Sequence, residues 1–161
     1  MLALPQLIEE DMQVLDGALQ DLLAKSDASV VLLLDQAGFL LSKAGEVEQF
    51  DTVTIGALAA NAFAATQAMA GLVQETQFNC LYQQGASYSV VVMNIEETCL
   101  LAVIFRAGLS VGAIRYYAAR TIDAIKSQLR AAYLRTPGMS LDLSSANLAD
   151  PSSLLRKAQT P

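Results

Sequence analysis

Residues 52–74 constrain the fold of this chain more than any other stretch, because they include no charged side chain. Asp51 precedes the stretch and Glu75 follows it. At 3.6 residues per turn, the pattern predicts a helix with two different faces. The face expected to pack on the core contains Ile55, Leu58, Ala59, Ala62, Phe63, Thr66, Met69, Ala70 and Val73. The opposite face contains the small or neutral residues Ala57, Ala60, Asn61, Ala64, Ala68 and Gly71.

Three environments suit a helix without a charged face. A membrane span needs about 20 apolar residues, but Asn61, Gln67 and Gln74 are polar and neither end has a Lys or Arg anchor. A helix wrapped on all sides by its own domain needs more layers than 161 residues readily supply. We therefore expect no membrane span, and a helix that shares its outer face with a partner.

The remaining patterns predict an α+β domain with one sheet. Residues 6–24 have helical periodicity, and two short apolar runs, 29–34 and 39–42, flank the turn residues Asp35 to Gly38. Beyond Glu75 the period changes to two, which predicts strands over 78–83, 87–93 and 98–105, and then a helix over 110–134. The order α-β-β-α-β-β-β-α favours a five-stranded antiparallel sheet with helices packed on it.

Composition changes after Pro137-Gly138, where Ser, Asp, Asn and Pro become frequent. We therefore expect a domain over residues 1–136 and a largely disordered C-terminal tail over 137–161. The net charge of −6 argues against nucleic acid as the main partner. Two cysteines do not form a disulfide framework, and the N-terminus lacks the pattern of a signal peptide, so we expect a cytoplasmic protein.

The sequence offers no arrangement of residues for enzymatic chemistry. It lacks histidine, the commonest general base and metal ligand. It also lacks both glycine-rich phosphate-binding motifs, G-x-x-x-x-G-K-[ST] and G-x-G-x-x-G. Cys80 and Cys99 lie in strand patterns and are expected in the core, while Glu96-Glu97 fits an exposed turn. We therefore predict no catalytic, cofactor-binding or metal site.

Three segments in this order resemble the roadblock/dynein-light-chain family over residues 5–135: LLLDQAGFLLSKAG, DTVTIGALAANAFAATQAMAGLVQE and YSVVVMNIEETCLLAVIF. The most distinctive pieces are the D-x-x-G turn at Asp35 to Gly38 and the small-residue run around Asn61. The likeness is greatest to the MglB type, bacterial GTPase-activating partners of a small Ras-like GTPase in cell polarity. Its fold is profilin-like.

The resemblance implies a homodimer whose sheets join edge to edge, with the two central helices side by side as the surface on which a GTPase docks. The partner and dimer face would then include Ala57, Ala60, Asn61, Ala64, Ala68 and Gly71. Members of the MglB type stimulate hydrolysis without an arginine finger, so Arg106, Arg115 and Arg120 are not assigned that role.

Three functions remain open. The first is a non-catalytic dimeric regulator of a Ras-like GTPase. The second is a roadblock-type adaptor or scaffold subunit without a GTPase-activating effect. The third is a small-molecule sensor, because a sheet covered by helices can hold a ligand.

Overall fold

The chain forms one antiparallel sheet with helices on both faces, as the computed structural model of residues 3–135 describes it. The elements along the chain are α1 (Glu9–Ser26), β1 (Val30–Asp35), β2 (Leu40–Gly45), α2 (Thr52–Ala70), β3 (Cys80–Gln84), β4 (Tyr88–Ile95), β5 (Cys99–Arg106) and α3 (Val111–Arg135). Single 3-10 turns lie at Val47–Gln49 and Gly71–Val73. The predicted order of elements is confirmed. The tail expected at 137–161 lies outside the described residues.

The strands are arranged in the order β2-β1-β5-β4-β3, and every neighbouring pair is antiparallel. The predicted five-stranded antiparallel sheet is therefore confirmed. Strands β1 and β5 occupy the middle of the sheet, where Val30 pairs with Ile104 and Asp35 with Cys99. Both strands are buried almost throughout, which explains why their sequences are continuous apolar runs instead of alternating ones.

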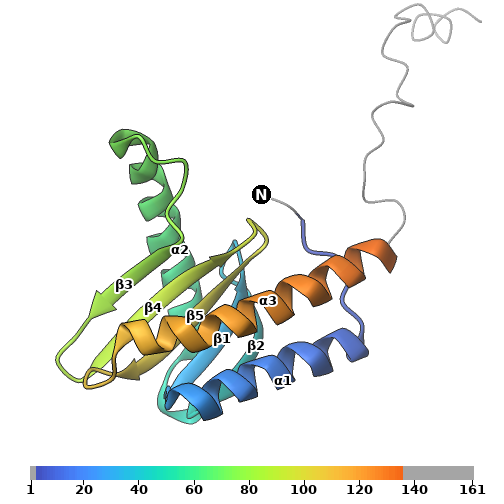
Figure 1. Cartoon of the computed structure of the whole chain (residues 1–161), viewed down its shortest axis with the longest axis horizontal. Coiled ribbons are helices and arrows are strands. Elements are labelled where there is room, and N and C mark those ends of the chain that lie inside the picture. The colour runs from blue at the N-terminus through green and yellow to red at the C-terminus, as the bar shows by residue number, and fades with distance from the viewer. Residues whose placement is uncertain (1–2, 136–161) are drawn as a thin grey trace, which may run out of the picture.

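Helices α1 and α3 cover one face of the sheet, and α2 is the one α-helix of residues 3–135 on the other (Figure 1). On the first face, Leu15 and Leu19 of α1 pack with Ile125 of α3 and with inward residues of the strands. On the second, Phe63 of α2 packs in a smaller cluster with Leu32 and Ala102. The C-terminal half of α2 projects past the sheet in Figure 1, and the segment that follows the helix contacts it through the hydrogen bonds of Gln67 to Phe78.

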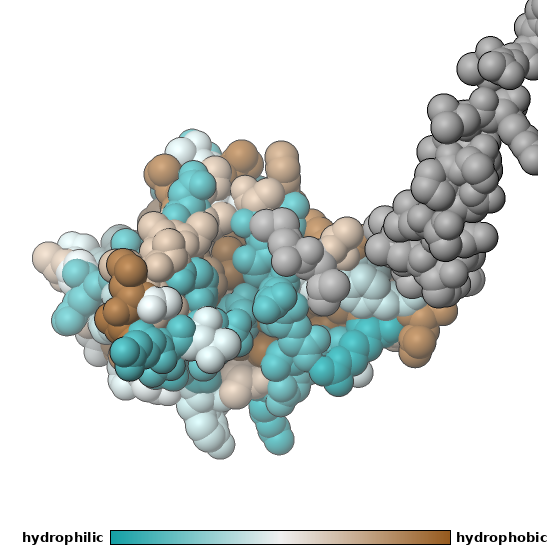
Figure 2. All heavy atoms as spheres, turned by 90° about the horizontal axis from the view of Figure 1, so that it is seen from above, coloured by the Kyte–Doolittle hydropathy of each residue, from teal (hydrophilic) through white to brown (hydrophobic). Residues whose placement is uncertain are grey.

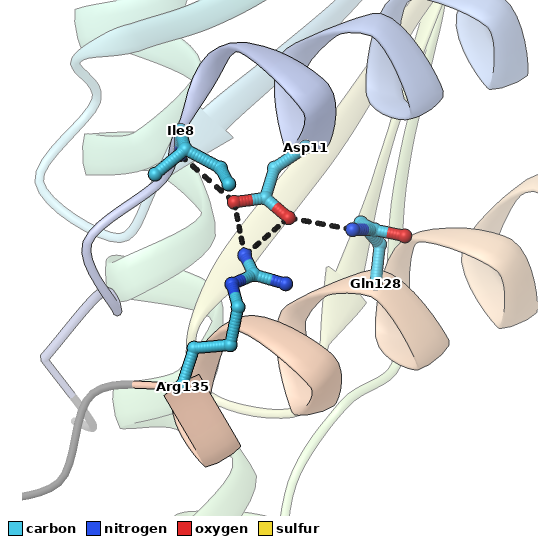
Figure 3. Close-up of polar contacts among 4 residues, drawn as sticks. All are labelled: Ile8, Asp11, Gln128 and Arg135. Atoms are coloured by element: carbon cyan, nitrogen blue, oxygen red, sulfur yellow. Dashed lines mark hydrogen bonds and ion pairs between the residues drawn. The ribbon is translucent and has the colours of Figure 1, made fainter.

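Helix α1 begins at Glu9, three residues later than its periodicity predicts, because Asp11 stabilises that start. The Ile8 N–H donates to Asp11 Oδ2 at 2.8 Å, which satisfies one of the unpaired amides at the helix N-terminus. Gln128 and Arg135, both on α3, also donate to the Asp11 carboxylate (Figure 3). A single buried carboxylate thus caps α1 and attaches it to the end of α3.

Helix α2 is long and apolar enough to cross a membrane by length and composition alone, and is the one such helix among the described residues. Its inner face nevertheless packs on the sheet, where Ala59 and Phe63 are buried. A core helix of a domain outside any membrane can have the same length and composition. Length and composition alone therefore do not indicate a membrane span.

Candidate functional site

The outer side of α2 is the candidate site, and it is almost free of polar groups. The exposed residues from Val53 to Met69, here called the α2 face, are Val53, Thr54, Ala57, Leu58, Asn61, Ala64, Ala65, Ala68 and Met69. Asn61 carries the one side-chain amide among them. Gly71, just past the helix, is exposed as well. The exposure expected of Ala57, Asn61, Ala64, Ala68 and Gly71 is therefore present; their role in binding stays a prediction.

The prediction that Ala60 belongs to the outer face is wrong. Ala60 is only 4% exposed and belongs to the cluster formed by Phe63, Leu32 and Ala102. Helical periodicity places Ala60 near the border between the two faces, and the neighbouring β1–β2 turn covers that border. A Cβ built on Gly38 of this turn would lie 3.1 Å from the Ala60 Cβ, which shows how closely the turn approaches.

Three residues expected in the core are exposed instead. Leu58 is 62% exposed, Met69 53% and Val73 60%. The sheet contacts a narrower arc of the helix than the apolar pattern suggests, because α2 is the sole α-helix that residues 3–135 place on its side and its C-terminal end projects beyond the strands (Figure 1). Large apolar side chains consequently border the small ones on the α2 face, and hydrophobic atoms are visible at the surface in Figure 2.

The D-x-x-G turn holds the N-terminal half of α2 in place. Asp35 Oδ1 accepts from the Ala37 and Phe39 amides at 2.9 and 2.8 Å, and the Gly38 amide donates to the Asp35 carbonyl. Gly38 has φ of 94°, and a Cβ there would lie 2.8 Å from the Ala57 Cα. Glycine is therefore required both for the backbone conformation and for the close approach. The same turn leaves Phe39 exposed.

Asp51 caps the N-terminus of α2. Its carboxylate accepts from the Thr54 amide at 3.1 Å and from the Thr54 hydroxyl at 2.6 Å. These hydrogen bonds lower the pKa of Asp51 below its ordinary value of 3.8. An acceptor at this position satisfies an unpaired amide of the first turn, and its negative charge is favourable near the positive end of the helix dipole.

An open cavity of about 310 Å³ lies beside the C-terminal half of α2, and we call it the α2 cavity. It lies between α2, the segment that follows the helix, and the two turns β1–β2 and β4–β5. Its lining is mainly amide and carboxylate side chains: Gln36, Phe63, Gln67, Thr76, Gln77, Asn94 and Glu97. No local pattern in the sequence indicates this cavity, because its residues come from four separate segments.

The described residues include no group of three or more His, Cys, Asp or Glu placed to hold a metal ion. Both cysteines are free, and burial raises the pKa of each, that of Cys99 to about 12. Such thiols stay protonated and unreactive near neutral pH. Cys80 lines a second cavity of about 490 Å³ between α3 and the strands β3 and β4, together with Met93, Arg115 and Lys126.

The strand order and the placement of α2 across one face of the sheet are those of a roadblock- or profilin-like fold. A model of the Roadblock/LC7 domain matches residues 15–105, more than half of the chain. The chain belongs to the Roadblock/LC7 family. A sequence search of curated proteins finds no match.

Solved structures of MglB proteins are similar along most of the chain. MglB of Myxococcus xanthus is 27% identical, with a TM-score of 0.73 over 79% of this chain and 96% of its own. The gliding protein MglB of Thermus thermophilus is 24% identical, with a TM-score of 0.74 over 81% and 99%. A structure described as MglB with a tetrameric arrangement is also 24% identical, with a TM-score of 0.74 over 82% and 99%.

Proposed function

We propose that this protein is a non-catalytic, homodimeric regulator of a small Ras-like GTPase, which it binds through the α2 face. The observation that carries the proposal is the uncharged, exposed α2 face in a chain that is similar to MglB of Myxococcus xanthus. No charge lies between Asp51 and Glu75, and Leu58 and Met69 are more than half exposed. An apolar surface of this kind is typical of protein interaction sites.

The free edges of the sheet support the proposed homodimer. Strand β2 has the charged Lys43, and charged side chains discourage pairing at an edge. Strand β3 at the other edge is CLYQQ and has no charge. Tyr82, Gln83 and Gln84 on it are exposed. Two copies can therefore pair their β3 strands in antiparallel fashion, which continues the sheet across a two-fold axis.

Sedimentation at micromolar concentration tests the assembly. We expect a mass of about twice 17.1 kDa. A sharp monomer peak would contradict the dimer. Because one structural relative is described as tetrameric, a species of four chains would indicate that the dimers associate further.

Single-turnover GTP hydrolysis, measured beside a pull-down, tests the function. The probes are the Ras-like GTPases of the same genome, loaded with GTP or GDP. We expect the wild-type protein to bind one of them preferentially in its GTP state and to accelerate hydrolysis. Binding without acceleration would favour an adaptor or scaffold subunit. Binding in neither nucleotide state would contradict the proposal.

We propose a cytoplasmic location for this regulator, since a Ras-like GTPase and its nucleotide are found there. Helix α2 has its inner face on the sheet and its outer face available to a protein partner.

A further inference from the structure

Gln36 lines the α2 cavity, and the orientation of its side-chain amide can be deduced. Gln36 Nε2 donates to the Cys99 carbonyl at 3.2 Å and to Asn94 Oδ1 at 3.0 Å. A carbonyl oxygen can only accept, so the amino end of the Gln36 amide must face Cys99. The carbonyl end, Gln36 Oε1, has no hydrogen-bond partner among residues 3–135 and is left available as an acceptor.

The side-chain amide of Gln67, which also lines the cavity, forms hydrogen bonds within the domain at both its oxygen and its nitrogen. Gln67 Oε1 accepts from the Phe78 amide at 3.0 Å, and Gln67 Nε2 donates to the Phe78 carbonyl. These two bonds hold the segment after α2 against the helix. Gln67 therefore shapes the cavity wall, and its amide has little capacity left for a ligand.

Glu97 gives the cavity a negative charge that nothing in the described domain neutralises. Glu97 lines the cavity, and it has no ion pair or hydrogen bond through its side chain within residues 3–135. Its neighbour Glu96 is engaged elsewhere, because its carboxylate pairs with Arg130 on α3, across the sheet from α2. The two adjacent acids thus have different surroundings.

Acidic side chains outnumber basic ones in the segments that adjoin the α2 face. From residue 44 to residue 105 the chain contains no Lys or Arg, and its acids are Glu46, Glu48, Asp51, Glu75, Glu96 and Glu97. Two bases that flank this segment, Lys43 and Arg106, pair in register with Leu32 and Tyr88 and therefore project on the α2 side of the sheet. Arg106 lies at the end of β5 remote from Glu97, where its guanidinium stacks on Tyr88 at 5.4 Å. A partner that covers the C-terminal half of α2 therefore meets one carboxylate, that of Glu97, which no basic side chain of residues 3–135 pairs with.

We propose that the α2 cavity receives a basic side chain, arginine or lysine, from the GTPase docked on the α2 face. Glu97 supplies the opposite charge and Gln36 Oε1 a second acceptor for the donors of a guanidinium or ammonium group. The apolar face supplies packing, and the cavity fixes the register of the partner on it. This inference rests on the proposed function, because it assigns the GTPase as the partner that presents the cation.

Glu97→Gln and Glu96→Gln form a matched pair for the test. Each removes one negative charge at adjacent positions and changes the side-chain size little. Glutamine also suits the backbone as well as glutamate does at φ of 57° and 48°. The change at Glu96 removes an ion pair with an exposed arginine, which contributes little to stability. Thermal unfolding and sedimentation of both variants check that fold and assembly are unchanged.

The measurement is the dissociation constant for the GTP-loaded Ras-like GTPase, taken by calorimetry at about 0.05 M and about 0.3 M salt. We expect Glu97→Gln to weaken binding about tenfold at the lower salt concentration, and to reduce the salt dependence of the affinity. Glu96→Gln should bind within about twofold of wild type. A merely structural role for Glu97 would not alter the salt dependence.

Failure of this inference can be told apart from failure of the proposed function. If the wild type binds the GTPase and Glu97→Gln binds equally well, or if Glu96→Gln loses as much affinity, the cavity does not receive a cation and the proposed function stands. If Glu97→Gln changes the assembly state, the cavity belongs to the dimer contact and the inference is overturned. If the wild type binds no GTPase, the proposed function fails and this inference with it.

Discussion

Asp11 and Arg135, 124 residues apart, form an ion pair in which Arg135 Nη2 donates to both carboxylate oxygens (Figure 3). The Asp11 side chain is fully buried, whereas that of Arg135 is 42% exposed. Gln128 Nε2 adds a third contact to the carboxylate at 2.6 Å. Because Asp11 also caps α1, the pair connects the first turn of one helix to the last turn of another.

The first prediction concerns the stability of this pair. Asp11→Ala should lower the free energy of unfolding by about 2 kcal/mol, the size expected when the Ile8 amide and the Gln128 amide lose a buried acceptor. Chemical denaturation measures the loss. Glu10→Gln is the control, because Glu10 is an exposed acid in the same turn and should change stability by less than about 0.5 kcal/mol. Equal effects of the two variants would contradict the prediction.

The second prediction is a pH dependence. The Ile8 amide, Arg135 and Gln128 hold the pKa of Asp11 below its ordinary value of 3.8, against the opposing effect of burial. A carboxyl with a lowered folded-state pKa stabilises the fold above its unfolded-state pKa, and this contribution is lost as pH falls through the folded-state value. The difference in unfolding free energy between wild type and Asp11→Asn should therefore be constant between about pH 5 and 8 and shrink below about pH 4. A difference that stays constant down to about pH 2 would contradict it.

The third prediction compares two glycines. Gly38→Ala should destabilise the fold by about 1–3 kcal/mol, because φ of 94° is strained for alanine and the added Cβ would lie 2.8 Å from the Ala57 Cα. Gly17→Ala should instead stabilise it by about 0.5–1 kcal/mol, since that glycine lies inside α1 with nothing within 4 Å of an added Cβ. Thermal melts of the two variants should therefore shift in opposite directions.

The fourth prediction concerns the α2 face. Ala68→Arg should keep the fold, because Ala68 is exposed, but lose GTPase binding and any stimulation of hydrolysis. A long charged side chain there would obstruct close packing or bury an unpaired charge, at a cost of several kcal/mol in binding.

The control for Ala68→Arg is Ala124→Arg, which makes the same change at an exposed position of α3 on the other side of the sheet. Sedimentation of both variants must first show an unchanged assembly state. Should Ala68→Arg bind and stimulate like wild type, the α2 face is not the docking surface.

The fifth prediction concerns truncation after Arg135. This cut removes residues 136–161 and leaves the Asp11–Arg135 pair intact. We expect the melting temperature to fall by less than about 5 °C, which corresponds to about 1 kcal/mol for a domain of this size. A larger fall would show that residues 136–161 contribute packing to the domain.

The order of helices and strands followed from the spacing of apolar residues. A repeat of two or of 3.6 residues is a local property of the chain. The continuous runs of β1 and β5 likewise indicated strands buried on both faces. The D-x-x-G turn and the absence of charge in α2 were evident from the sequence alone. These features depend on neighbours within a few residues, so the sequence determined them alone.

What covers each residue was decided by the tertiary structure. Ala60 is buried because a turn about twenty residues earlier packs over it, and Met69 is exposed because the sheet does not reach the end of α2. The Asp11–Arg135 pair joins residues 124 positions apart, and the α2 cavity is lined by residues from four segments. Contacts of this range depend on how the elements are placed in space, and the local pattern of side chains does not specify that placement.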